Sequence, residues 1–117
     1  MRKIYHLSTC NTCQRIIKEL QPLAKFELQD IKTEAITLSQ LEEMKTLVGS
    51  YEALFSRRAM LYKERGLAAK ELTENDFRAL ILDHYTFLKR PVILFDNQIF
   101  VGNSKKVIEK AIAAIKS

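Results

Sequence analysis

The segment Val92–Phe95 constrains the fold more than any other part of this chain, because its four consecutive residues are all apolar. Pro91 precedes the segment and the pair Asp96-Asn97 follows it, so it has the length of a single strand. A strand that does not alternate between apolar and polar residues is typical of a sheet that is buried on both faces. The sequence therefore predicts a fully buried strand over residues 92–95.

Three other segments extend this sheet. Residues 2–7 are rich in β-prone side chains, and residues 25–29 alternate apolar and polar ones. Residues 98–102 follow the strand at 92–95 after only the two residues Asp96-Asn97, a spacing that predicts a hairpin. We therefore expect four strands.

A helix is predicted between the first two strands. Thr9 or Asn11 is a suitable cap, and the apolar spacing continues to about Leu20, after which Pro22 prevents the helix from continuing. The order strand, helix, strand within about thirty residues is typical of a parallel pair joined by a right-handed crossover.

The middle of the chain shows only helical patterns. Thr37 or Ser39 begins one helix with a capping box, short helical segments follow, and Thr73 begins a further helix. We expect this further helix to bury a stripe formed by Phe77, Leu80, Ile81, His84, Tyr85 and Leu88. Asn103 or Ser104 then caps a last helix.

The resulting order is β-α-β, a helical segment, then β-β-α. It predicts an α/β protein with a thioredoxin-like fold, in which a four-stranded mixed sheet carries an all-helical insertion between strands two and three. We expect a single domain over residues 1–117, with a core at 1–32 and 89–117 and an insertion over about 37–88.

Composition excludes several classes of protein. With 47% hydrophobic residues in 117, the chain can bury a core. The net charge of +5 comes from dispersed Lys and Arg residues, so we expect an anionic substrate or an acidic protein partner but no nucleic acid. No apolar run approaches the roughly 20 residues of a membrane span, and no signal peptide is recognisable, so we expect no membrane association and a cytoplasmic location.

Both cysteines, Cys10 and Cys13, lie at Cys-x-x-Cys spacing between the first predicted strand and the helix that follows it. The free N–H groups and positive dipole of a helix N-terminus favour an anion, here the Cys10 thiolate. His6 and Arg15 are the nearby cation candidates. Cys13 is close enough to attack an adduct formed on Cys10, so the motif predicts redox thiol chemistry.

Metal binding, a structural disulfide and simple burial are weaker alternatives for the two cysteines. A zinc site needs two more ligands, and the sequence offers only His6 and His84, so we expect no metal. A structural disulfide across so short a loop constrains the unfolded chain little. Cysteines are also common as small buried hydrophobic residues. The position of the motif between a strand and a helix nevertheless favours a redox function.

Pro91 precedes the third strand. In thioredoxin-like folds a proline at this point, often in the cis form, faces the cysteine motif. The alternative is that Pro91 only ends the preceding helix.

Over essentially its whole length the chain resembles the arsenate reductase (ArsC/Spx) family. The resemblance rests on His6-x-x-x-Cys10, the segment Cys10-Asn-Thr-Cys13, Ser56-Arg57-Arg58, Arg90-Pro91-Val92-Ile93, and Val101-Gly102-Asn103-Ser104 before the last helix.

This resemblance implies roles for individual residues. Cys10 matches the cysteine that attacks arsenate, and His6 matches the histidine that helps to hold it as a thiolate. Thr12 occupies a hydroxyl position of the anion loop. Arg90 matches an arginine that binds the oxyanion, and Arg57 or Arg58 aligns with another. The adduct is then resolved with glutathione and glutaredoxin.

Three features differ from those reductases. Gln14 replaces an arginine, no arginine occurs in residues 101–104, and the middle arginine aligns only approximately with Arg57 or Arg58. Cys13 is an addition. The added Cys13 matches the Spx-type members, which are redox-sensing regulators that bind the α subunit of RNA polymerase.

Two functions are therefore expected. The first is a monomeric thiol reductase with Cys10 as nucleophile, Cys13 as resolving thiol, and an anion clamp of Arg90 with Arg58 or Arg57. Its substrate is arsenate or a thiol or disulfide such as glutathione and its mixed disulfides. Glutaredoxin or thioredoxin is the reductant, and no cofactor is tightly bound. The alternative is an Spx-like regulator of RNA polymerase.

Overall fold

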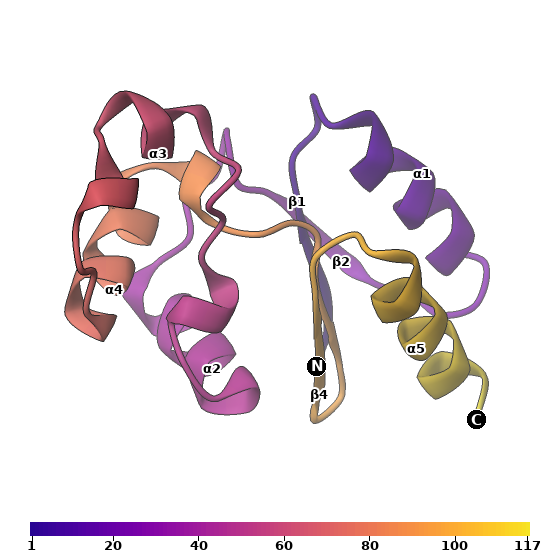
Figure 1. Ribbon diagram of the computed structural model, residues 1–117. Coiled ribbons are helices and arrows are strands. Elements are labelled where there is room, and N and C mark those ends of the chain that lie inside the picture. Colours follow the sequence, from indigo (N-terminus) through magenta and orange to yellow (C-terminus); the bar gives the residue numbers. More distant parts are fainter. The chain divides into compact units, whose positions relative to one another are not determined.

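The computed structural model describes all residues from 1 to 117, and the chain divides into two compact units (Figure 1). We call Met1–Glu34 together with Arg90–Ser117 the sheet unit, and Ala35–Lys89 the helical unit. No helix in either unit is both long enough and apolar enough to cross a lipid bilayer.

The sheet unit contains a four-stranded mixed sheet, so the predicted fold class is confirmed. The strand order is β2-β1-β3-β4, with β1 parallel to β2 and antiparallel to β3, and with β3 antiparallel to β4. The strands are β1 (Arg2–His6), β2 (Glu27–Asp30), β3 (Val92–Phe95) and β4 (Gln98–Val101). Both parallel strands end at the same edge of the sheet, which brings His6 and Asp30 into register there.

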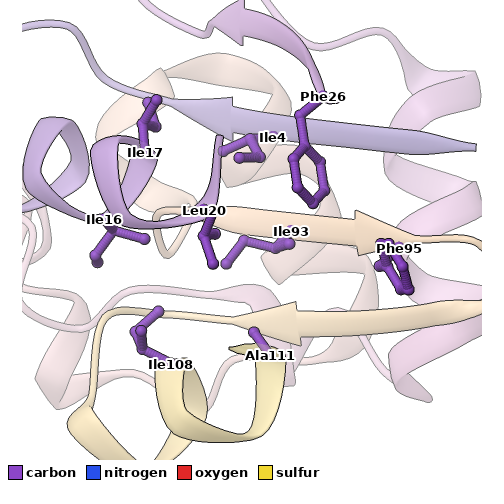
Figure 2. Packing of buried hydrophobic residues seen from close by; sticks show 9 residues of the cluster. All are labelled: Ile4, Ile16, Ile17, Leu20, Phe26, Ile93, Phe95, Ile108 and Ala111. Carbon is purple, nitrogen blue, oxygen red and sulfur yellow. The ribbon is translucent and has the colours of Figure 1, made fainter. Parts of the chain in front are cut away.

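All four residues of β3 are buried, as the apolar run predicts. Two helices, α1 (Asn11–Leu20) and α5 (Lys105–Lys116), contribute to one core cluster with the sheet (Figure 2). The cluster consists of Ile4, Ile16, Ile17, Leu20, Phe26, Ile93, Phe95, Ile108 and Ala111. Burial of these side chains stabilises the unit and packs α1 and α5 against the sheet.

The helical unit is built from short segments around an aromatic cluster. Phe55 is fully buried, and its ring centroid lies 4.8 Å from that of Phe77, 5.4 Å from that of Phe87 and 5.9 Å from that of Tyr62. The segments are α2 (Leu38–Val48), η1 (Glu52–Leu54), α3 (Met60–Glu64), η2 (Leu67–Ala69), α4 (Glu74–Asp83) and η3 (Tyr85–Phe87).

Three predicted caps are present. Thr37 and Gln40 form a capping box at α2, and Thr73 and Asp76 form one at α4. Ser104, rather than Asn103, caps α5. In each case the side-chain oxygen accepts a hydrogen bond from a free backbone N–H of the first turn, which is why these sequence patterns predict helix starts well.

The prediction that one helix continues through His84 was wrong. His84 has an extended backbone (φ −151°, ψ 135°), and its Nδ1 atom accepts a hydrogen bond from the Thr86 N–H at 3.1 Å. The imidazole therefore caps the following turn instead of continuing the apolar stripe. His84 also stacks on Tyr85, with ring centroids 4.4 Å apart.

Candidate active site

The loop between β1 and α1 places Cys10 at the start of the helix. The Cys10 N–H donates to the Leu7 carbonyl at 3.0 Å, and the Cys10 carbonyl accepts from the Gln14 N–H at 3.1 Å. Cys10 is therefore the N-cap residue itself, and the prediction of Thr9 or Asn11 as the cap was wrong. No oxygen-bearing side chain caps α1, so its first N–H groups remain for the sulfur.

The surroundings of Cys10 favour its thiolate. Partial burial raises the pKa of this thiol, but the sum of the other interactions lowers it below its ordinary value. The N–H groups of Cys13 and Thr12, the Cys13 thiol and the charge of Arg90 all stabilise the anion. Cys10 is half-buried and has no disulfide bond, so a substrate can approach its sulfur.

Cys13 has the opposite properties. It is fully buried, and burial raises the pKa of its thiol to about 11, against the effect of the Leu7 N–H and of Arg90. The neighbouring Cys10 raises it further, because two adjacent thiolates repel each other. At neutral pH Cys13 is thus protonated and donates to Cys10.

His6 is buried at the end of β1. Its Nδ1 atom lies 3.3 Å from the Gln14 Nε2 atom, which also donates to the Leu7 carbonyl at 3.2 Å. The neighbouring Asp30 holds the loop after β1: its Oδ1 accepts from the N–H groups of Ser8 at 3.3 Å and of Lys32 at 3.1 Å. The Ser8 side chain contributes most to lowering the Asp30 pKa, and the charge of His6 contributes as well.

Gln14 and Asp30 were not among the residues predicted for the site. Asp30 ends a strand that is parallel to β1, so its position at the same sheet edge as His6 follows from the topology. Gln14 follows Cys13 in the chain, but only the fold reveals its contacts with the end of β1.

Arg90 and Pro91 immediately precede β3, and the peptide bond between them is cis. Pro91 is buried, and its carbonyl accepts from the Gly102 N–H at 2.9 Å. Arg90 is half-buried, and its charge lowers the pKa of both cysteine thiols. Arg90 is one of three predicted anion-binding arginines. It lies in the sheet unit, and its charge acts on both thiols.

The two other predicted anion-binding arginines lie in the helical unit. The Arg57 Nη2 atom forms an ion pair with Glu52 Oε2 at 2.9 Å, and its guanidinium lies over the rings of Phe77, at 5.4 Å, and Phe55, at 6.0 Å. The hydrogen bond to Glu52 is also the main reason why the pKa of Arg57 is raised. Arg58 is exposed and has no ion pair.

No group of three or more His, Cys, Asp and Glu side chains is placed to hold a metal ion. Thr12 is half-buried, and its backbone N–H is the part that acts on Cys10. The site is thus a pair of thiols with unequal acidity, one nearby guanidinium and a helix N-terminus.

The sequence profile of the ArsC family matches residues 5–111 of this chain. Among curated proteins, the chain is 24% identical over 110 residues to a global transcriptional regulator, Spx 2, from Bacillus anthracis. That match covers 92% of this chain and 83% of the regulator.

Solved structures of similar fold include an ArsC family related protein from Bacteroides fragilis, with a TM-score of 0.79 and 25% identity over 93% of this chain and 95% of that one. An arsenate reductase from Vibrio cholerae has a TM-score of 0.79 at 17% identity, with coverage of 96% and 95%. At that identity the likeness to the reductase concerns the fold alone.

Proposed function

Because this chain belongs to the ArsC family, we propose that it is a thiol-dependent oxidoreductase in which Cys10 is the nucleophile and Cys13 the resolving thiol. The unequal acidity of the two thiols carries this proposal: the pKa of Cys10 is lowered, whereas that of Cys13 is raised to about 11. A thiolate is the reactive form of cysteine, so attack begins at Cys10.

Arsenate is the first proposed substrate. The Cys10 thiolate attacks the As(V) atom, and one arsenate oxygen leaves as water after taking up protons. Arg90 holds the oxyanion through its forked guanidinium, and the N–H groups at the start of α1 contribute to the same anion site. His6 and Thr12 support the thiolate and the anion loop.

Cys13 completes the cycle. Formation of the adduct removes the negative charge from Cys10, and with it one of the causes of the raised Cys13 pKa. The Cys13 sulfur then loses its proton and attacks the Cys10 sulfur. The Cys10–arsenic bond breaks, its electron pair remains on arsenic as As(III), and a Cys10–Cys13 disulfide forms. Thioredoxin, or glutaredoxin with glutathione, supplies the two electrons that reduce this disulfide.

A glutathione mixed disulfide is the second proposed substrate class. There the Cys10 thiolate attacks one sulfur, the other leaves as a thiolate, and Cys13 again resolves the product. No tightly bound cofactor is required in either case, and a reducing compartment such as the cytoplasm keeps both thiols available.

Of the two neighbouring arginines of the helical unit, Arg58 is the better proposed anion-binding residue. Arg57 is held by Glu52 and by two aromatic rings, so recruiting it would break an ion pair. Arg58 has no ion pair to break.

The test is arsenate-dependent NADPH consumption, coupled in parallel to glutathione with glutaredoxin and to thioredoxin with its reductase. We expect turnover that disappears in Cys10→Ser. Dependence on thioredoxin in the wild type, replaced by dependence on glutathione in Cys13→Ser, would support the resolving role of Cys13. Absence of turnover with arsenate and with a glutathione mixed disulfide would overturn the enzymatic proposal.

The second candidate function is a redox-sensing regulator that binds RNA polymerase through its α subunit. It is favoured by the likeness to the Bacillus anthracis regulator and by the presence of Cys13. A pull-down with the purified α subunit under oxidising and reducing conditions tests it, with Cys13→Ser as the control that cannot form the disulfide. Binding that depends on the disulfide would favour the regulator over the enzyme.

A further inference from the structure

The Gln14 carboxamide joins α1 to the end of β1. Its Nε2 atom lies 3.2 Å from the Leu7 carbonyl oxygen and 3.3 Å from Nδ1 of His6. Gln14 is half-buried and His6 is only 8% exposed, so water competes little for these contacts. One side chain thus contacts both the last residue of β1 and the first carbonyl of the cysteine loop.

The Leu7 carbonyl decides the orientation of this carboxamide. A carbonyl oxygen only accepts hydrogen bonds, so the Gln14 atom that faces it must be the nitrogen and not the oxygen. The same nitrogen faces His6 Nδ1 and carries a second hydrogen for it. Nδ1 must then present its lone pair, which places the proton of the neutral imidazole on Nε2.

We propose that Gln14 is a positioning residue that fixes His6 as the Nε2–H tautomer. His6 therefore offers a hydrogen-bond donor at Nε2, while its Nδ1 atom is occupied and does not act as a base. This role goes beyond the proposed reaction, because it concerns the state of His6 before any substrate binds.

The contacts of Gln14 are part of the same network that holds the thiols. The Leu7 carbonyl accepts from the Cys10 N–H as well as from Gln14, and the Leu7 N–H acts on the Cys13 sulfur. Replacing the hydrogen-bond donor at residue 14 therefore affects His6 and also Leu7, whose backbone contacts both cysteines.

The tautomer can be measured directly by long-range proton–nitrogen NMR correlation on the reduced, ¹⁵N-labelled protein. The chain has only two histidines, so the spectrum contains two imidazoles. His84 is an internal reference, because its Nδ1 accepts from the Thr86 N–H in a different unit and its neutral ring is also expected to be Nε2–H. We expect the Nε2–H pattern for His6 in the wild type.

Three variants separate donor character from mere packing. Gln14→Arg presents only donors and should preserve the Nε2–H pattern. Gln14→Glu presents only acceptors and should move the proton of His6 to Nδ1. Gln14→Leu removes both hydrogen bonds at similar size and should give a mixture of the two tautomers.

An Nδ1–H pattern for His6 in the wild type would overturn the proposal, as would a folded Gln14→Glu protein in which His6 is unchanged. A variant whose amide spectrum has lost the dispersion of the wild type has not folded, and the wild-type and Gln14→Arg spectra then still decide. The readout needs no turnover, so its failure is distinguishable from failure of the proposed enzymatic function.

Discussion

The two units use their polar groups differently. In the sheet unit, the Cys10 sulfur is stabilised mainly by peptide N–H groups and by the neighbouring thiol. In the helical unit, Arg57 and Arg65 each form an ion pair at 2.9 Å, with Glu52 and Asp83, and each guanidinium lies over an aromatic ring. The first arrangement activates a group, whereas the second holds short segments together.

Substitutions should therefore act differently in the two units. Two of the four groups that lower the pKa of Cys10 are backbone N–H groups, which most side-chain substitutions leave in place. The arginines of the helical unit have specific side-chain partners, so their replacement affects stability. We expect some substitutions in the sheet unit to change the reactivity of Cys10 and others to change the stability of the protein. Substitutions in the helical unit should mainly change stability.

The largest effect is expected for Cys10→Ser. It removes the thiolate and should lower turnover by roughly 10³-fold or more, as loss of a nucleophile does in other enzymes. Mass spectrometry after brief alkylation at neutral pH should show modification of Cys10 in the wild type and none in the variant. Cys13→Ser is the matched control, since it should retain alkylation of Cys10 but form no internal disulfide. Faster alkylation of Cys13 than of Cys10 in the native protein would reverse the assigned roles.

The next largest effect is expected for Phe55→Ala in the helical unit. Its ring is fully buried against three aromatic neighbours, so its loss should lower the free energy of unfolding by about 3–5 kcal/mol. Denaturant titration measures this change.

Phe26→Ala is the matched substitution in the sheet unit. Phe26 is 8% exposed and has one aromatic neighbour, Phe95, at 6.2 Å. We expect a smaller loss of stability than for Phe55→Ala. In the native state of both variants Cys10 should be alkylated at the wild-type rate. A larger loss for Phe26→Ala would contradict the view that the helical unit depends most on its aromatic cluster.

Local sequence rules account for much of the fold. The apolar run at Val92–Phe95 gives a buried strand, and the caps at Thr37, Thr73 and Ser104 are used as predicted. The caps depend on interactions between residues close in the chain, and the burial of the strand follows from its own uninterrupted apolar composition. The helix break at His84 is different, because the imidazole could equally have been buried as part of an apolar stripe.

The site was less predictable than the fold. The spacing of Cys10 and Cys13 indicates a helix start, but Cys10 serves as the cap itself, so its sulfur is close to N–H groups that Thr9 or Asn11 would otherwise have used. The contact of Gln14 with His6 crosses the cysteine loop, and no periodicity reveals it. Such contacts depend on how the helix is fixed to the sheet.

The raised pKa of Cys13 predicts that the protein loses stability at alkaline pH, by less than Phe55→Ala does and by more than Arg57→Ala does. The folded state holds this proton more tightly than the unfolded chain does. The protonated Cys13 thiol therefore contributes to the free energy of unfolding. This contribution is fully present below pH about 9.0 and is lost as the pH rises towards about 11. With allowance for solvent screening, roughly 2 kcal/mol should be lost.

Denaturant titrations of the wild type and Cys13→Ala between pH 8 and 11 measure this effect. The difference between the two curves removes the contribution of Lys and Tyr residues that titrate in both proteins. A difference that does not change with pH would mean that Cys13 is no weaker an acid in the folded state than in the unfolded one.

The smallest effects distinguish Arg57 from Arg58, which are neighbours in the chain but differ in their contacts. Arg57→Ala removes a partly exposed ion pair and two cation–π contacts, so the free energy of unfolding should fall by about 0.5–1 kcal/mol. Arg58→Ala removes no ion pair and should change it by less than about 0.5 kcal/mol. The KM for an anionic substrate should show the reverse order, rising several-fold only in Arg58→Ala and recovering in Arg58→Lys. If KM instead rose in Arg57→Ala alone, Arg57 would be the anion-binding residue, and its pairing with Glu52 would have to break whenever substrate binds.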